Sequence, residues 1–291
     1  MASRLQPHHY VTTVANIKMP KLIYGTAWKK ERTEELVTKA LRKGFRGIDT
    51  ACQPKHYNEP GVGAAVKKLI DANEIRREDV FLQTKFTSLD GQDPNRIPYD
   101  PQAPLNEQVL QSLETSLKNL QTDYIDSLVM HSPMRTYNDT ILVWRVFESF
   151  VNAGKVRQLG ISNCYDLKTL TRLYDEAVVK PAVIQNRFYR DTGYDKGIRQ
   201  FAKEHNLYYE SFWTLTANPR ILALPAVSRM AKKYGKTVEQ IFFGYLINSA
   251  GMTPLTGTTN EKHMEEDLEA LDIHLTSEEA AVFDAIVNSG R

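Results

Sequence analysis

The feature that most constrains the fold is an alternation of short apolar runs, typical of strands, with amphipathic helical segments. Strands are expected at residues 21–26, 45–48, 80–84, 124–130, 156–161, 182–185, 207–212 and 252–255. Helices are expected at residues 32–43, 60–70, 106–119, 141–151, 167–176, 196–204, 227–234, 238–248, 260–271 and 277–287. Strands that alternate with helices indicate a parallel sheet. Eight such units favour one closed (β/α)8 barrel over two open sheets.

The length of the chain, 291 residues, suits a barrel that typically needs about 250 residues. We therefore expect a single barrel domain over residues 1–291, with residues 1–20 as an irregular N-terminal extension. Residues 272–291 are expected to form a short C-terminal tail with a helix. Loop 87–105 is unusually long for a compact fold, and loops of this length are often functional.

Charge and composition limit the partners. The chain has 37 Lys and Arg against 35 Asp and Glu, a net charge of +2, which argues against nucleic acid as the main partner. The absence of a signal peptide and of an apolar run near 18 residues predicts no membrane partner. Two cysteines, Cys52 and Cys164, fit a reducing compartment, so we expect a cytoplasmic protein. The sequence leaves the oligomeric state open.

Four polar side chains follow predicted strands. Asp49 comes directly after one strand, and Tyr57 lies in the loop beyond it. Lys85 and His131 end two further strands. Barrel enzymes display their chemistry at the C-terminal ends of the strands, so these residues are candidates for one catalytic set.

Each of the four has an ordinary structural explanation when taken alone. A strand-end Asp is often a helix cap, a Tyr is often a packing residue, and a Lys is often solvated. A His at a strand end is more often structural than catalytic. The chain shows no His, Asp and Glu cluster with ligand spacing, so a metal-assisted hydrolase is disfavoured and no metal is expected.

With these residues in place, the sequence resembles the aldo-keto reductase family over about residues 21–271. The motifs that carry the resemblance stand in family order: GFRGIDTA, YNE, QTKF, MHSP, GISN and the glutamine of VIQN. Members of that family are (β/α)8 barrels that bind a nicotinamide cofactor without a GxGxxG motif. This chain likewise has no GxGxxG after its first strand.

The resemblance implies a role for each of the four residues. Tyr57 would be the general acid that protonates the carbonyl oxygen as hydride reaches the carbon. An ordinary tyrosine has a pKa near 10, and the cation of Lys85 is expected to lower it. Asp49 would pair with Lys85, and His131 would orient the carbonyl group. The cofactor itself supplies the hydride.

The resemblance also implies a cofactor site. Ser162, Asn163 and Gln185 would hold the carboxamide of the nicotinamide, and Phe212 would stack on its ring. The full set of residues implied is Gly25, Thr26, Asp49, Ser162, Asn163, Gln185, Phe212, Trp213, Thr214, Leu215, Gly257, Thr258, Thr259, His263, Glu266 and Asp267.

Three departures from the family pattern affect these assignments. The tail after the last barrel helix is shorter than the C-terminal loop of many members, so the loops 87–105 and 213–224 are expected to wall an open substrate pocket. Tyr57 lies farther beyond Asp49 than the family's tyrosine usually does, which leaves the adjacent His56 as the alternative acid. The usual Pro-Lys-Ser and arginine clamp for a 2′-phosphate is replaced by Pro254-Leu255-Thr256, with His263 in the arginine's place. Lys262 remains a candidate for that phosphate. NADP(H) is therefore the preferred cofactor, with NAD(H) as the alternative.

The sequence thus predicts reduction of an aldehyde or ketone, a small-molecule carbonyl substrate, by an NAD(P)H-dependent enzyme. The alternative from another class is a non-catalytic regulatory barrel that binds a nicotinamide nucleotide and a protein partner. The set of Asp49, Tyr57, Lys85 and His131 argues against that alternative.

Overall fold

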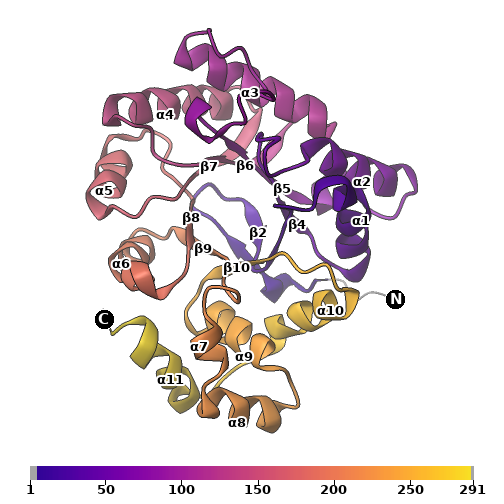
Figure 1. Ribbon diagram of the computed structural model, residues 1–291, viewed down its shortest axis with the longest axis vertical. Helices are drawn as coiled ribbons and strands as arrows, with labels where there is room; N and C mark the ends of the chain where they lie inside the picture. The colour runs from indigo at the N-terminus through magenta and orange to yellow at the C-terminus, as the bar shows by residue number, and fades with distance from the viewer. Residues whose placement is uncertain (1–4, 290–291) are drawn as a thin grey trace.

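The computed structural model describes residues 5–289 and confirms the (β/α)8 barrel. Eight parallel strands of the described chain close into a ring in the order β10-β3-β4-β5-β6-β7-β8-β9 (Figure 1). Their bounds are β3 Ile23–Gly25, β4 Gly47–Asp49, β5 Phe81–Phe86, β6 Ile125–Met130, β7 Val156–Ser162, β8 Val183–Arg187, β9 Tyr208–Phe212 and β10 Thr253–Thr256. Each predicted strand is present, with bounds that shift by a few residues.

Helices surround this ring and bury their apolar faces against it (Figure 1). In α1 (Thr33–Lys43), Leu36, Val37, Ala40 and Leu41 are buried, and Gly44 ends the helix with a φ of 123°. The other helices of the barrel layer are α2 Glu59–Asp71, α3 Leu105–Leu120, α4 Tyr137–Asn152, α5 Leu167–Glu176, α6 Lys196–Glu204, α8 Pro225–Tyr234, α9 Val238–Gly244 and α10 Glu261–Glu269. The i, i+3, i+4 spacing of apolar residues that predicted α1 is the spacing that buries one face of a helix.

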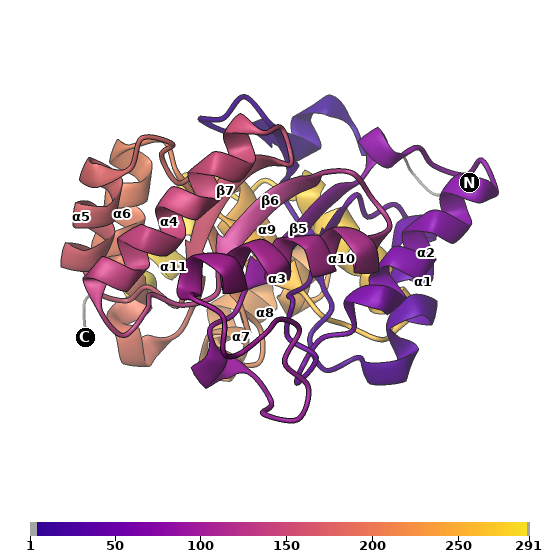
Figure 2. The ribbon, with the colours of Figure 1, turned by 90° about the horizontal axis from the view of Figure 1, so that it is seen from above.

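The N-terminal extension is not irregular over residues 5–20, which corrects the expectation from the sequence; residues 1–4 lie outside the described chain. Strands β1 (Tyr10–Thr12) and β2 (Lys18–Pro20) pair as an antiparallel hairpin. Met19 of this hairpin is fully buried in a cluster with Ile23 and Phe81, which lie at the starts of barrel strands. The hairpin therefore closes the N-terminal end of the barrel, and loop 87–105 lies at the opposite end (Figure 2).

The chain after the last strand packs on the outside of the barrel. Helix α11 (Ser277–Val287) buries Phe283, whose ring stacks on Tyr245 at a centroid distance of 4.5 Å. A short helix, α7 (Pro219–Leu222), lies in the loop after β9 and was not predicted. Within residues 5–289, no helix combines the length and the apolar character that a membrane crossing requires.

Candidate active site

Asp49 and Lys85 form a buried ion pair at the mouth of the barrel. Asp49 ends β4, and Lys85 lies near the end of the neighbouring strand β5. Lys85 Nζ lies 2.6 Å from Asp49 Oδ2 and 2.7 Å from Oδ1, and it also donates to the Thr50 carbonyl oxygen at 2.9 Å. The two residues are 2% and 1% exposed. Burial is the largest single effect and would lower the pKa of Lys85, but the charge and hydrogen bonds of Asp49, together with Tyr57 and Glu210, outweigh it and the pKa is raised.

Tyr57 lies above this pair. Two contacts hold the loop that carries Tyr57. The backbone N–H of Tyr57 donates to the Gln53 carbonyl oxygen at 3.0 Å, and the side chain of Asn58 caps the N-terminus of α2. The centroid of the Tyr57 ring lies 5.2 Å from Lys85 Nζ and 6.0 Å from the centroid of the His131 ring. The structure therefore brings the four predicted strand-end residues together.

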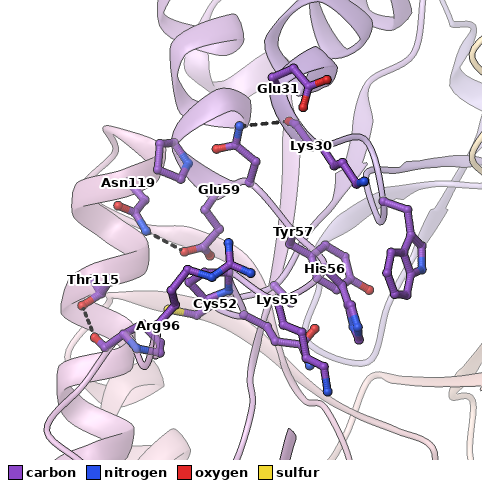
Figure 3. Close-up of a pocket in the computed structure, with 17 residues that line it drawn as sticks. Lys30, Glu31, Cys52, Lys55, His56, Tyr57, Glu59, Arg96, Thr115 and Asn119 are labelled. Carbon is purple, nitrogen blue, oxygen red and sulfur yellow. Dashed lines mark hydrogen bonds between the residues drawn. The ribbon is translucent and has the colours of Figure 1, made fainter. Parts of the chain in front are cut away.

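His56, the neighbour of Tyr57, borders the same cavity as the cluster but packs on a different residue. Its ring lies against Trp28, with the centroids 3.9 Å apart. His56 and Lys55 also border a separate pocket, distinct from the two cavities described below. On the opposite side of this pocket, Asn119 donates to the buried Glu59 (Figure 3). Of the two neighbouring candidates for the acid, Tyr57 is the one in contact with Lys85.

The expected direction of the Tyr57 pKa shift is wrong. Burial raises the pKa of Tyr57, and the nearby charge of Asp49 raises it further. Lys85 acts in the expected direction and lowers the pKa, but its effect is smaller than that of burial. Tyr57 therefore keeps its proton across the neutral pH range, which a general acid requires before it reacts.

His131 follows β6 and is held by a residue that the sequence did not single out. The hydroxyl of Thr87, beyond β5, lies 2.6 Å from His131 Nδ1. Burial lowers the pKa of His131 to about 3, and the cation of Lys85 adds to that effect. The imidazole is therefore neutral at pH 7. When the Thr87 hydroxyl donates to Nδ1, the ring proton lies on Nε2 and is available to a ligand.

Two cavities at the mouth of the barrel are lined by most of the predicted site residues. The first, of about 520 Å³, contains the predicted residues Gly25, Asp49, Tyr57, His131, Ser162, Asn163, Gln185, Phe212, Trp213 and Gly257. The second, of about 610 Å³, contains Trp213, Thr214, Leu215, Gly257, Thr258, His263, Glu266 and Asp267. We call them the catalytic cavity and the outer cavity. They share Trp213, Leu255, Thr256 and Gly257, so together they form one extended site.

Some predicted positions lie elsewhere. Thr26 is fully buried and its hydroxyl donates to the Asp49 carbonyl oxygen at 2.8 Å, so it supports β4 rather than lining either cavity. Thr259 is exposed and outside both cavities. Loop 87–105 does not line the catalytic cavity, contrary to expectation; the wall there comes from residues such as Trp28, Tyr165 and Tyr189.

A network of polar side chains inside the barrel was not identified from the sequence. Glu210 of β9 is fully buried, and its Oε2 accepts from the amides of Gln83 at 2.6 Å and Gln185 at 2.8 Å. The same two amides donate to Asp49 Oδ1, each at 3.0 Å. Burial raises the pKa of Glu210 to about 7, and Asp49 adds to that shift. The strand period of two places Gln83 on the same face as Lys85, which is a signal that could have found it.

Lys29 is a further site residue that was not identified from the sequence. It lies in the loop after β3, is 8% exposed, and its ammonium donates to the Gly257 carbonyl oxygen. Among residues 5–289 it has no carboxylate partner. Burial lowers its pKa to about 8. A buried cation without a counter-ion beside a cavity is costly unless a ligand brings the opposite charge.

The only group of potential metal ligands found in the described part of the chain lies far from this mouth. His8 and His9 both bond Asp272 Oδ1 through Nε2, at 3.0 Å and 2.8 Å. Because His9 Nδ1 accepts from the Gln6 backbone N–H, its Nε2 carries the ring proton and has no lone pair for a metal. The cluster ties the N-terminal segment to the end of the α10 region.

Comparison with known proteins decides the family. The sequence profile of the Aldo/keto reductase family matches residues 21–215 and 191–288. The chain belongs to the aldo-keto reductase family. This aldo-keto reductase is 29% identical over 264 residues to methylglyoxal reductase DkgA of Yersinia pestis, which covers 90% of this chain and 86% of the relative. It is 28% identical over 253 residues to glyoxal reductase of Bacillus subtilis (strain 168), with coverages of 87% and 82%.

The fold of this chain matches that of a solved structure over nearly its whole length. MGS-M4, an aldo-keto reductase enzyme from a Medee basin deep-sea metagenome library, has a TM-score of 0.80 and 28% sequence identity. The match covers 97% of this aldo-keto reductase and 96% of the other chain. The protein is therefore an oxidoreductase of a family that reduces carbonyl compounds.

Proposed function

We propose that the protein reduces an aldehyde or ketone to an alcohol with NADP(H), and that Tyr57 is the general acid. One observation carries this proposal: the buried pair of Lys85 and Asp49 lies directly beneath Tyr57, with neutral His131 beside it. A carbonyl oxygen in the catalytic cavity meets a proton donor on one side and a neutral hydrogen-bond donor on the other.

Each side chain has one task in this mechanism. The Nε2–H of His131 orients the carbonyl oxygen, and Tyr57 Oη transfers its proton to that oxygen as negative charge develops there. The tyrosinate that remains is stabilised by the ammonium of Lys85. Asp49 keeps Lys85 charged and in place, and the amides of Gln83 and Gln185 hold Asp49.

A nicotinamide cofactor, when bound, supplies the hydride. The residues fit it in two respects. The catalytic and outer cavities meet at Trp213 and Gly257, as an extended dinucleotide requires. Both amide hydrogens of Gln185 are engaged by carboxylates, which leaves its carbonyl oxygen for the carboxamide, with Ser162 and Asn163 nearby and the Phe212 ring to stack on.

The buried ammonium of Lys29 supports an anionic cofactor, because a phosphate group would supply the charge that it lacks. The preference for NADP(H) over NAD(H) rests on the outer cavity. His263 and Thr258 line that cavity, whereas Lys262 forms an ion pair with Glu266 at 3.4 Å. A cytoplasmic location is proposed because Cys52 and Cys164 are both free and buried.

The test is reduction of methylglyoxal and glyoxal, chosen because two relatives are named for these substrates. Loss of NADPH absorbance reports turnover, and quenching of tryptophan fluorescence reports binding next to the exposed Trp213. We expect Tyr57→Phe to keep less than about a tenth of kcat, a barrier increase above about 1.4 kcal/mol, with nearly unchanged NADPH affinity.

The matched comparison is His56→Phe, which changes the alternative acid next to Tyr57. We expect this variant to retain turnover. The opposite pattern, in which Tyr57→Phe is active and His56→Phe is not, would make His56 the acid. Saturable NADPH binding without turnover of any aldehyde would favour the regulatory barrel instead.

A further inference from the structure

Arg187 is a second cation of the catalytic cavity that the reaction described above does not use. It is the last residue of β8, two positions after Gln185. Side chains two apart on a strand point to the same side, and both residues line the catalytic cavity. Arg187 lines this cavity, where the carbonyl group is proposed to react, and not the outer one.

Neighbouring aromatic rings hold the guanidinium in position. Its Cζ lies 4.2 Å from the centroid of the Trp213 ring and 5.0 Å from that of Tyr189. The backbone N–H of Arg187 donates to Tyr165 Oη at 3.0 Å, which fixes the end of the strand. A guanidinium stacked on an aromatic face keeps its N–H edge free for a planar, bidentate partner such as a carboxylate.

No protein group supplies that partner. Within the described chain, no carboxylate forms an ion pair with Arg187. Asp49 is the one carboxylate that lines the catalytic cavity, and it is already paired with Lys85. The two cavity histidines, His56 and His131, have lowered pKa values and are neutral at pH 7. The cavity therefore has an excess of positive charge from Lys29 and Arg187.

The two cations serve different ligands. Lys29 bonds Gly257, which lines both cavities, and it lies where a cofactor phosphate would pass between them. Arg187 lies on the same strand face as Gln185. We propose that Arg187 binds an anionic group on the substrate, so that the preferred substrates are aldehydes or ketones that also carry a carboxylate or a phosphate. This inference rests on the proposed carbonyl reduction.

The experiment compares two substrates of nearly equal size, 4-carboxybenzaldehyde and methyl 4-formylbenzoate. The acid carries the charge and the ester does not. The readout is the ratio of kcat/KM for the acid to kcat/KM for the ester. In the wild-type protein we expect the ratio to exceed one and to fall between about 0.05 M and about 0.5 M NaCl, because salt screens the attraction.

Arg187→Gln is expected to lower that ratio by about tenfold or more, mainly through KM for the acid, since one charge-assisted bond is removed. Arg190→Gln is the matched control, because Arg190 is exposed and lies outside both cavities. It should leave the ratio unchanged. Arg187→Lys keeps the positive charge but loses the planar, bidentate set of N–H donors, and should give an intermediate ratio.

Three outcomes would overturn the proposal. A wild-type ratio near one, without salt dependence, means that no anion site faces the substrate; this test needs no variant to fold. An equal loss for acid and ester in Arg187→Gln means that Arg187 only supports the structure. A rise in the dissociation constant for NADPH, with the substrate ratio unchanged, assigns Arg187 to a cofactor phosphate. Failure of the wild type to turn over either substrate counts against carbonyl reduction itself.

Discussion

The ammonium of Lys85 lies within 2.7 Å of both carboxylate oxygens of Asp49, and neither side chain is more than 3% exposed. A buried ion pair stabilises a protein only while both partners are present, because the remaining charge has lost its water. The pair therefore matters for folding as well as for the chemistry of Tyr57.

We expect Asp49→Asn to lower the free energy of unfolding by about 3–5 kcal/mol, since Lys85 is left buried without a counter-ion. Urea unfolding measures the loss. Asp71→Asn is the control, because Asp71 forms an ion pair with Lys67 that is exposed on α2. An exposed pair contributes about 0–1 kcal/mol. Equal losses in the two variants would show that the buried pair has no special role.

Lys29 is expected to make cofactor binding depend on pH. Its pKa of about 8 in the free protein means that it is largely protonated at pH 7 and largely neutral at pH 9. A phosphate bound next to it would raise that pKa. NADPH binding near pH 8.5 should therefore take up a proton, and affinity should fall as the pH rises through this range. Calorimetry in buffers of different ionisation enthalpy measures the uptake.

The variant that tests this is Lys29→Met. It should abolish the proton uptake and raise the dissociation constant for NADPH by about tenfold to a hundredfold, because one charge-assisted bond is lost. Lys30→Met is the control, since Lys30 is exposed and lines neither the catalytic nor the outer cavity. Proton uptake that persists in Lys29→Met would assign it to another group.

Glu210 is expected to reduce stability as the pH rises. Its pKa is raised to about 7, so between about pH 4.5 and pH 7 the folded protein binds a proton that the unfolded chain has released. That contribution is complete below the unfolded pKa and is lost as the pH rises through 7. Glu210→Gln should therefore be more stable than the wild type at pH 8, by up to about 3 kcal/mol.

Urea unfolding of both proteins at several pH values tests this expectation. The difference between wild type and Glu210→Gln cancels the titration of all other groups, so the two proteins control each other. Below about pH 4.5 the two stabilities should be close, because Glu210 is protonated in both states. A difference that does not vary with pH would mean that Glu210 does not titrate in this range.

Most of the fold was accessible from the sequence because it depends on local periodicity. The i, i+3, i+4 spacing in α1 and the apolar strand runs are properties of short segments. The N-terminal hairpin was missed because its strands have three residues each, and Met19 is buried only where the barrel strands meet.

The sequence by itself determined the barrel and the strand-end set of Asp49, Lys85 and His131, because parallel strands of one barrel bring all their C-terminal ends to one mouth. Only the tertiary structure decided that Tyr57, and not His56, contacts Lys85, since both lie in one loop whose path depends on packing. It also decided the partners of Glu210 and brought Lys29 to Gly257, 228 residues away. Burial and long-range contact set the charges and pKa values of this site, and both arise only when the barrel closes.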